Sequence, residues 1–326
     1  MRSFVHLPAL LLLAVGVLTV GGIYTIKRGL AVAGGGPRIG SISYRLPLTM
    51  RGAYATAEAS LPGVDQPLHL VIDSTSRDDV IDRKFAWAAS ALEQDASEDA
   101  QVRHLNGRTA PPPMVRFEGM RVGNMTLTGP FTVAETELST ATSEESVDGI
   151  LGTNVIALYD ATFDIKRGEL LLRSSAVDEG RCYLNSYPGR SEALRKISFM
   201  DVSLRKGGSK VRAVIDTGAS HTVMNLAAAM TLRLRPGDLS LRRLKRVVKN
   251  TSSTAVPDTW LYDLPRLEIG EWLLGPTEVR ISQLPIFDEL SPDGQPTIIL
   301  GIDVLRQRRI TIKSGAAAFC VSRGDE

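Results

Sequence analysis

The chain has 326 residues, long enough for two domains that each enclose a core of their own. Its net charge of +2, from 38 basic and 36 acidic residues, gives no electrostatic reason to expect a nucleic-acid partner. Aromatic residues make up 6%, whereas glycine occurs 29 times and proline 17 times. This composition favours a turn-rich β protein over a helical bundle.

The N-terminal region contains an uncharged segment, residues 7–26, of the length that crosses a membrane. As a helix it would span about 30 Å, the thickness of a bilayer core. Lys27-Arg28 ends the segment and favours an uncleaved anchor, whereas Ala31-Val32-Ala33 is typical of a signal-peptide cleavage site. We therefore expect residues 1–39 to form an anchor, or a signal peptide, followed by a flexible tether. Both alternatives predict that the rest of the chain is exported.

Three short segments recur in the same order in the two halves of the chain. The pairs are LVIDST and AVIDTG (residues 70–75 and 213–218), VGN and IGE (122–124 and 269–271), and GILGTNV and IILGIDV (149–155 and 298–304). Because their spacing is nearly constant, the repeat predicts two homologous lobes. We place lobe one at 40–178, a connection at 179–195 and lobe two at 196–326.

Each lobe is predicted to consist mainly of short strands. Runs of apolar and β-branched residues between glycine, proline and aspartate indicate strands at 54–61, 68–72, 197–204 and 211–215. Short helices are expected at 85–92, at 225–234 and directly after Gly152 and Gly301. The predicted fold class is therefore all-β with a few short helices, in two pseudo-symmetric barrel-like lobes around a shared cleft.

The segment from Asp216 to Ser220 is the motif with the clearest chemistry. An apolar strand delivers Asp216 into a tight turn. Gly218 has no Cβ, so it is expected to let backbone amides approach the carboxylate and to allow unusual dihedrals in the turn. The hydroxyl of Thr217 has the position to hydrogen-bond the matching loop of the other lobe. Two carboxyls held together cannot both ionise easily, so the pair shares one proton and acts as base and acid on a water molecule.

This loop, Asp-Thr-Gly-Ala-Ser, resembles the signature of the retropepsin-like aspartic proteases, including bacterial members. Residues 298–301, Ile-Ile-Leu-Gly, are similar to the second hallmark of that family, an apolar triplet and a glycine beneath the active-site loop. The resemblance covers about residues 40–322 and is stronger in lobe two. It implies an aspartic endopeptidase, a hydrolase that uses a water nucleophile and needs no metal or other cofactor. The site residues that it implies are Asp216 and Asp73 as catalytic groups, Thr217, Gly218, Ala219, Ser220, Ser74 and Thr75 as loop support, and Gly152 and Gly301 as loop-packing glycines.

Lobe one departs from this pattern in its aspartate loop. Ser74 retains the hydroxyl, but Thr75 places a β-branched side chain where Gly218 stands in lobe two. Arg77 follows closely and is expected to lower the pKa of Asp73 and hold it charged. Three hypotheses stay open: a dyad of Asp73 and Asp216, a peptide-binding pseudoprotease with a decayed first lobe, and a homodimer that pairs two copies of Asp216.

Other polar residues give weaker signals. The four histidines lack metal-ligand spacing. His221 is not expected to form a catalytic pair with Ser220, because neighbours on an extended strand point to opposite sides. Segments 106–113 and 250–257 are predicted to be flaps, with ordinary surface loops as the alternative. The basic residues between 233 and 249 indicate a solvated surface or contact with anionic lipid.

The two cysteines, Cys182 and Cys320, are predicted to form a disulfide, because paired cysteines are usual in exported domains. Two separate buried thiols are the alternative. Taken with the resemblance, these features predict a single-pass protein of a bacterial inner membrane, held by residues 7–26, with its catalytic part in the periplasm. Secretion to the periplasm after signal cleavage is the alternative. The expected substrates are envelope or membrane-associated proteins.

Overall fold

The computed structural model describes residues 42–88, 91–93, 114–134, 147–174, 181–183, 186–191, 194–244, 258–314 and 318–322. The predicted anchor at 7–26 and both predicted flaps lie outside these residues. Within them, no helix has the length and apolar character needed to cross a membrane.

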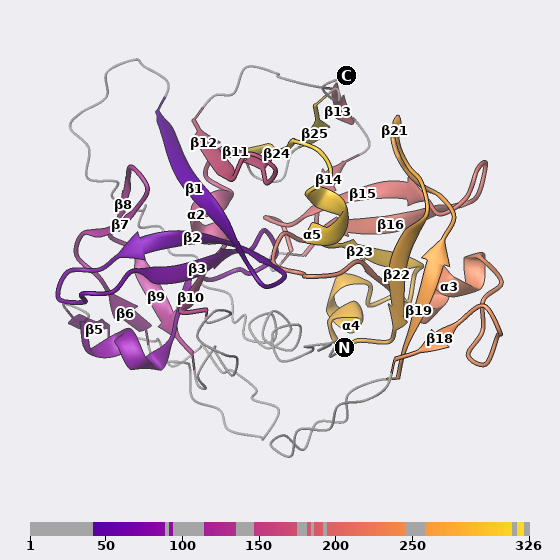
Figure 1. Cartoon of the computed structure of the whole chain (residues 1–326), viewed down its shortest axis with the longest axis horizontal. Coiled ribbons are helices and arrows are strands. Elements are labelled where there is room, and N and C mark those ends of the chain that lie inside the picture. Colours follow the sequence, from indigo (N-terminus) through magenta and orange to yellow (C-terminus); the bar gives the residue numbers. More distant parts are fainter. Residues whose placement is uncertain are drawn as a thin grey trace, which may run out of the picture.

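The protein is mainly β, with short helices at the ends of strands, and its two halves lie side by side (Figure 1). The first half contains β1 (Ser43–Arg51), β2 (Tyr54–Ser60), β3 (Leu68–Ile72), β4 (Val80–Ile81), the 3-10 helix η1 (Arg83–Ala88), β5 (Ala91–Glu93), β6 (Met114–Arg116), β7 (Met120–Val122), β8 (Met125–Leu127), β9 (Pro130–Val133), β10 (Gly149–Leu151), α2 (Thr153–Ile156), β11 (Asp160–Asp164) and β12 (Glu169–Arg173). The second half contains β13 (Arg181–Tyr183), β14 (Tyr187–Pro188), β15 (Ser198–Ser203), β16 (Lys210–Ile215), β17 (Val223–Met224), α3 (Leu226–Thr231), β18 (Arg242–Arg243), β19 (Thr259–Leu264), β20 (Leu267–Ile269), β21 (Trp272–Leu274), β22 (Thr277–Ser282), α4 (Ile286–Leu290), β23 (Thr297–Leu300), α5 (Ile302–Leu305), β24 (Ile310–Ile312) and β25 (Phe319–Val321).

The predicted repeat is present as a repeat of strand pairings. In the first half β3 pairs with β2 and, in parallel, with β10, and β10 pairs antiparallel with β4. In the second half β16 pairs with β15 and, in parallel, with β23, and β23 pairs antiparallel with β17. The register agrees as well, because Ile72 lies opposite Leu151 and Ile215 lies opposite Leu300. Both aspartate loops therefore begin at the end of the same kind of central strand.

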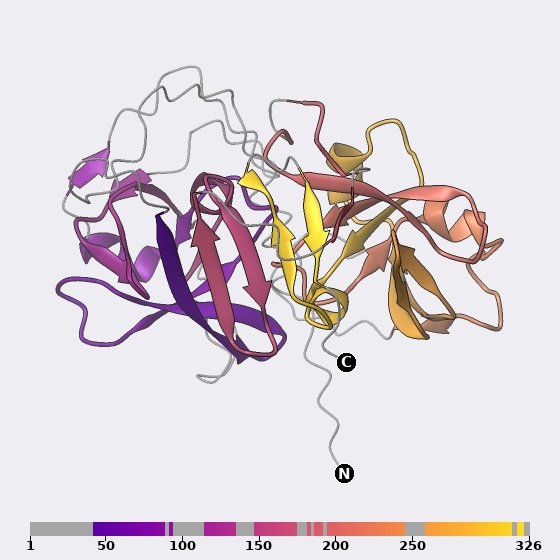
Figure 2. The same cartoon turned by 90° about the horizontal axis from the view of Figure 1, so that it is seen from above.

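The two halves are joined by a sheet to which both contribute. Strand β24 pairs with β11 of the first half, and β25 pairs with β24 and with β13. Viewed from above, this hairpin lies between the two halves (Figure 2). At the junction the Thr162 and Thr311 hydroxyls are 2.8 Å apart, and Lys313 Nζ lies 3.1 Å from an oxygen of the buried Asp160 carboxylate. Residues 310–321, assigned to lobe two from the sequence, thus complete the sheet of the first half.

The same sheet places the two cysteines opposite each other. In the register of β13 and β25, Cys182 is the partner of Cys320, and Cys320 is disulfide-bonded. Since the chain has two cysteines, this bond ties the start of the second half to its last described strand.

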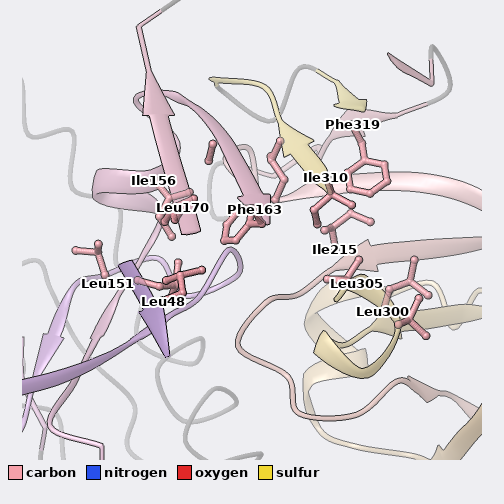
Figure 3. Packing of buried hydrophobic residues seen from close by; sticks show 14 of the residues in the cluster. Leu48, Leu151, Ile156, Phe163, Leu170, Ile215, Leu300, Leu305, Ile310 and Phe319 are labelled. Atoms are coloured by element: carbon pink, nitrogen blue, oxygen red, sulfur yellow. The ribbon is translucent and has the colours of Figure 1, made fainter. Parts of the chain in front are cut away.

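One cluster of buried apolar side chains runs through both halves. In Figure 3, Ile310 and Phe319 lie between apolar side chains of the first half, such as Phe163, and those of the second half, such as Ile215 and Leu305. The core is therefore continuous across the junction, and burial of apolar area there holds the halves together at about 25 cal/mol per Å².

The helices follow the sequence prediction in part. Helix α3 begins where predicted, because the side chain of Asn225 accepts a hydrogen bond of 2.8 Å from the backbone N–H of Ala228 and caps it. The expected helix at 85–92 is instead a 3-10 helix, η1, and residues 91–93 pair with β6 as a strand. Helix α4 was not predicted, and it packs Phe287 and Leu290 over Ile299 of the second-half sheet in a separate apolar cluster.

Candidate active site

The two aspartates occupy equivalent places in the two halves. Asp73 follows β3, and its N–H donates to the carbonyl of Leu151 over 3.0 Å; Asp216 follows β16, and its N–H donates to the carbonyl of Leu300 over 3.0 Å. Because each strand lies in the middle of a sheet, both carboxyls are carried into the interior, where Asp73 is 1% exposed and Asp216 is 6% exposed. The fold thus presents two buried carboxyls on matching loops.

The glycine after each apolar triplet supports its aspartate loop. A Cβ on Gly152 would lie 2.7 Å from the carbonyl oxygen of Ser76, and a Cβ on Gly301 would lie 2.8 Å from that of Ala219. Each glycine N–H also donates to a side chain of the loop above it, Gly152 to Asp79 over 2.7 Å and Gly301 to Thr222 over 3.1 Å. These glycines are needed because loop backbone occupies the space of a side chain.

Sequence reasoning did not assign this supporting role to Asp79 and Thr222. Their common offset of 143 positions, the offset that separates the two aspartates, is the signal that could have found them. Burial raises the pKa of Asp79 to about 8, so this carboxyl is protonated at neutral pH.

The two loops exchange hydrogen bonds through their hydroxyl side chains. Thr217 Oγ1 accepts from the N–H of Ser74 over 3.0 Å and donates to the carbonyl of Ile72 over 2.8 Å. Ser74 Oγ accepts from the N–H of Thr217 over 3.1 Å and donates to the carbonyl of Ile215 over 2.8 Å. Each loop therefore completes the other, and the exchange fixes the two aspartates in register within a single chain.

Each carboxyl also accepts hydrogen bonds from its own loop. Asp216 Oδ1 accepts from the N–H groups of Gly218 and Ala219, both over 2.9 Å. Asp73 Oδ1 accepts from the N–H groups of Thr75 and Ser76 over 2.8 and 2.9 Å. The loops thus have the same backbone arrangement despite the difference between Thr75 and Gly218.

The unusual backbone dihedrals predicted for Gly218 are not found, whereas the predicted approach of backbone amides to the Asp216 carboxyl is. Neither Gly218 nor Thr75 has a positive φ, so no left-handed conformation requires glycine. The reason is steric: a Cβ on Gly218 would collide with the carboxyl of Asp73 and lie 2.9 Å from its Cβ. The collision also shows that the Asp73 carboxyl lies directly against the loop of Asp216.

The pKa values of the two aspartates are linked. Burial, followed by the negative charge of Asp73, raises the pKa of Asp216 to about 8. Burial also raises the pKa of Asp73, and hydrogen bonds from Thr75 and Ser76 oppose that rise. Two buried carboxyls coupled in this way do not both ionise near neutral pH, so the pair holds one proton.

The role predicted for Arg77 is not found. Burial raises the pKa of both Asp78 and Glu289, and the Arg77 guanidinium opposes both shifts. The groups that favour the ionised form of Asp73 are Thr75 and Ser76 instead. The charge of Arg77 therefore acts on Asp78 and Glu289 rather than on Asp73.

The side chains of Ser220 and His221 do not lie on opposite sides as expected, while their lack of a catalytic role stays a prediction. Ser220 Oγ and His221 Nδ1 are 2.8 Å apart and form a hydrogen bond. The two residues lie in a bend, so the alternation of an extended strand does not apply. Burial lowers the pKa of His221 to about 4, so the imidazole is neutral at pH 7. Within the described part of the chain, no three His, Cys, Asp or Glu residues are grouped so that they could hold a metal ion.

Comparison with known families gives two separate matches in this chain. Residues 57–155 and residues 202–304 each match the family described as aspartyl protease. The matched ranges contain Asp73 and Asp216 in corresponding positions, together with the glycines beneath their loops. No curated protein matches the chain. The chain therefore belongs to the aspartyl protease family, a family of peptidases, and carries the family's domain twice in one polypeptide.

Proposed function

We propose that this chain is an aspartic endopeptidase in which Asp73 and Asp216 of one polypeptide form the catalytic dyad. The observation that carries the proposal is the exchange of hydrogen bonds between Ser74 and Thr217. This exchange ties the two loops together and leaves both carboxyls buried side by side. The pair then has what water activation requires, one charged and one protonated carboxyl.

The chemistry follows from these protonation states. The Asp73 carboxylate takes a proton from a water molecule as the water attacks the peptide carbonyl. The protonated Asp216 donates a hydrogen bond to the developing oxyanion, and Asp73 then gives the proton that it took from the water to the departing amine, which restores the dyad. Since Asp216 must hold its proton, activity should fall as the pH rises through about 8.

The structure favours this arrangement over the two rivals. In a homodimer that paired two Asp216 loops, Thr217 would have to leave Ile72 and Ser74, which it already contacts within the chain. In a decayed first lobe, the Asp73 loop would not need its three hydrogen-bond donors to the carboxyl. The homodimer and the pseudoprotease each predict a different result in the peptide-cleavage assay.

We further propose that the protease acts outside the cytoplasm, held at a bacterial inner membrane by residues 7–26 or secreted after signal cleavage. The disulfide of Cys320 supports an oxidising compartment such as the periplasm. The uncharged segment 7–26 supports a tether to the membrane. Envelope and membrane-associated proteins are the substrates within reach of such a protease.

The test uses the full chain purified in detergent micelles and a library of internally quenched peptides with blocked ends. Blocked ends restrict the assay to internal cleavage. Wild type should cleave, whereas Asp216→Asn, Asp73→Asn and the double variant should all fall to the same background, because the members of one catalytic unit are not additive. The exposed Asp65 supplies the matched control, Asp65→Asn, which should keep wild-type activity.

Two outcomes would select a rival. Activity that survives in Asp73→Asn and falls per molecule on dilution would establish the homodimer. Peptide binding without cleavage by the folded wild type would establish the pseudoprotease. Thermal unfolding of each variant confirms that a lost activity does not reflect a lost fold.

A further inference from the structure

The two aspartate loops carry different residues at one position that lies next to a catalytic carboxyl, position 75 of the first half. In the second half this position is Gly218, and a Cβ there would collide with the carboxyl of Asp73. In the first half the position carries a complete threonine side chain, 1% exposed, in a loop with the same backbone hydrogen bonds. The site therefore accepts a side chain on one side of the dyad and excludes one on the other.

The hydroxyl of this threonine changes the number of donors to one carboxyl. Thr75 Oγ1 donates to Asp73 Oδ1 over 2.8 Å, in addition to the N–H groups of Thr75 and Ser76. The corresponding oxygen of Asp216 accepts from two backbone N–H groups, those of Gly218 and Ala219. Without Thr75 Oγ1, the two loops would supply the same donors from the same places.

Donors to a carboxylate favour its ionised form, most strongly where water is excluded. The third donor therefore favours the charged form of Asp73. The same hydroxyl also lowers the pKa of Asp216, but its hydrogen bond of 2.8 Å is made to Asp73. Two coupled carboxyls share one proton unequally as soon as one has better donors. One additional hydrogen bond, from the side chain of Thr75, is therefore enough to decide which of the two carboxyls holds the proton.

From this geometry we propose that Thr75 is a positioning residue that assigns the two catalytic roles, by holding Asp73 as the base and leaving the proton to Asp216. The inference rests on the proposed function and goes beyond it, because it gives a role to the threonine that stands where the second half has glycine. Threonine at position 75, which in the sequence suggested a lost function, thus assigns the base and acid roles of the dyad before any substrate binds.

The test compares Thr75→Val with Thr75→Ser in the full chain. Valine keeps the β-branched shape and removes the donor, whereas serine keeps the donor. The acidic limb of the kcat/KM profile reports the pKa of the charged member in the free enzyme. A hydrogen bond to a charged group is worth enough to move a pKa by roughly one unit. We expect Thr75→Val to move the acidic limb upward by about one pH unit and Thr75→Ser to keep the wild-type limb.

A purely structural role for Thr75 would not produce this pattern. It would change stability or the plateau of kcat/KM and leave the limb in place, and an unmoved limb in a folded Thr75→Val protein would overturn the inference. Should Thr75→Val fail to fold, Thr75→Ala compared with Thr75→Ser makes the same distinction, because both are smaller than threonine and only serine donates.

A second measurement separates this inference from the proposed function. Carboxyl-¹³C NMR of aspartate-labelled full chain, with Asp73→Asn and Asp216→Asn to assign the signals, follows each titration without any substrate. Asp73 should titrate about one unit higher in Thr75→Val than in wild type or Thr75→Ser. Equal titration in all three would refute the role of Thr75 even if the peptides are cleaved. A shifted titration in a chain that cleaves no peptide would uphold the role of Thr75 and refute the proposed protease.

Discussion

Gly218→Ala tests the packing of the dyad most directly, because it adds one methyl group at the point where the two halves touch. The new Cβ would collide with the Asp73 carboxyl and lie 2.9 Å from Asp73 Cβ. Carbon atoms pack at about 3.5–4.0 Å, so the carboxyl would have to retreat by about 1 Å. That carboxyl is held by its own loop and cannot move out into solvent, since Asp73 is 1% exposed.

The expected losses follow from this displacement. Overpacking a buried site costs about 1–3 kcal/mol of unfolding free energy. A catalytic group misplaced by about 1 Å costs on the order of 100-fold in rate. We therefore expect kcat/KM to fall by about two orders of magnitude or more, while urea unfolding still shows one cooperative but weakened transition.

Gly275→Ala is the matched control. No atom lies within 4 Å of a Cβ at Gly275, and its backbone does not have a positive φ. The same change should therefore leave activity and stability close to those of wild type. If Gly218→Ala were as active and as stable as Gly275→Ala, the close approach of Asp73 to the opposite loop would be refuted.

Three further predictions concern the hydrogen bonds between the loops, the buried Asp79 and the disulfide. Thr217→Val removes two exchanged hydrogen bonds of a buried group and should lower the unfolding free energy by about 1–3 kcal/mol and abolish activity. Burial raises the pKa of Asp79 to about 8, so the folded chain keeps a proton that the unfolded chain has lost, and the unfolding free energy should decline from about pH 4 to about pH 8. Asp79→Asn should make that decline shallower by up to about 1.4 kcal/mol per pH unit, as measured by urea unfolding across this interval. Replacing Cys182 or Cys320 by alanine should cost on the order of 4–5 kcal/mol, measured in the same way, because the bond encloses nearly the whole second half.

Each of these variants has a control in the chain. Thr217→Ser keeps the hydroxyl and should retain the exchange. For Asp79→Asn, the exposed Asp65→Asn should leave the pH dependence of unfolding as in wild type. Reductant should destabilise wild type by as much as the cysteine replacements and leave those variants unaffected; equal stability with and without reductant would show that the disulfide contributes nothing.

The sequence was sufficient for the elements that carry a local signal. The apolar runs at 68–72 and 211–215 are strands, and each delivers an aspartate as predicted. The hydroxyls of Ser74 and Thr217 contact the opposite loop, as expected from the repeat. These features could be predicted because the two halves repeat the same segments, so that a motif in one half identifies its counterpart in the other.

The contacts across the dyad could not be predicted in the same way. Whether position 218 needs glycine for its backbone or for the space in front of it depends on what lies opposite, and Asp73 is 145 positions away. Thr75 therefore looked like damage to a turn, although its backbone is ordinary and its hydroxyl contacts Asp73. The direction of the His221 side chain was misjudged for a related reason, since the alternation of an extended strand does not apply in a bend.

The sheet between the halves has a consequence for the order of synthesis and folding. Strand β11 of the first half finds its second neighbour, β24, through contacts such as that of Thr162 with Thr311, 149 positions further along the chain. While a ribosome is still making the second half, β11 is an open edge with unpaired backbone groups, a template for pairing with other chains. Contacts of such long sequence separation also form slowly, because the intervening chain must first be ordered. A nascent first half should therefore depend on chaperones until residues 310–312 emerge and close the edge.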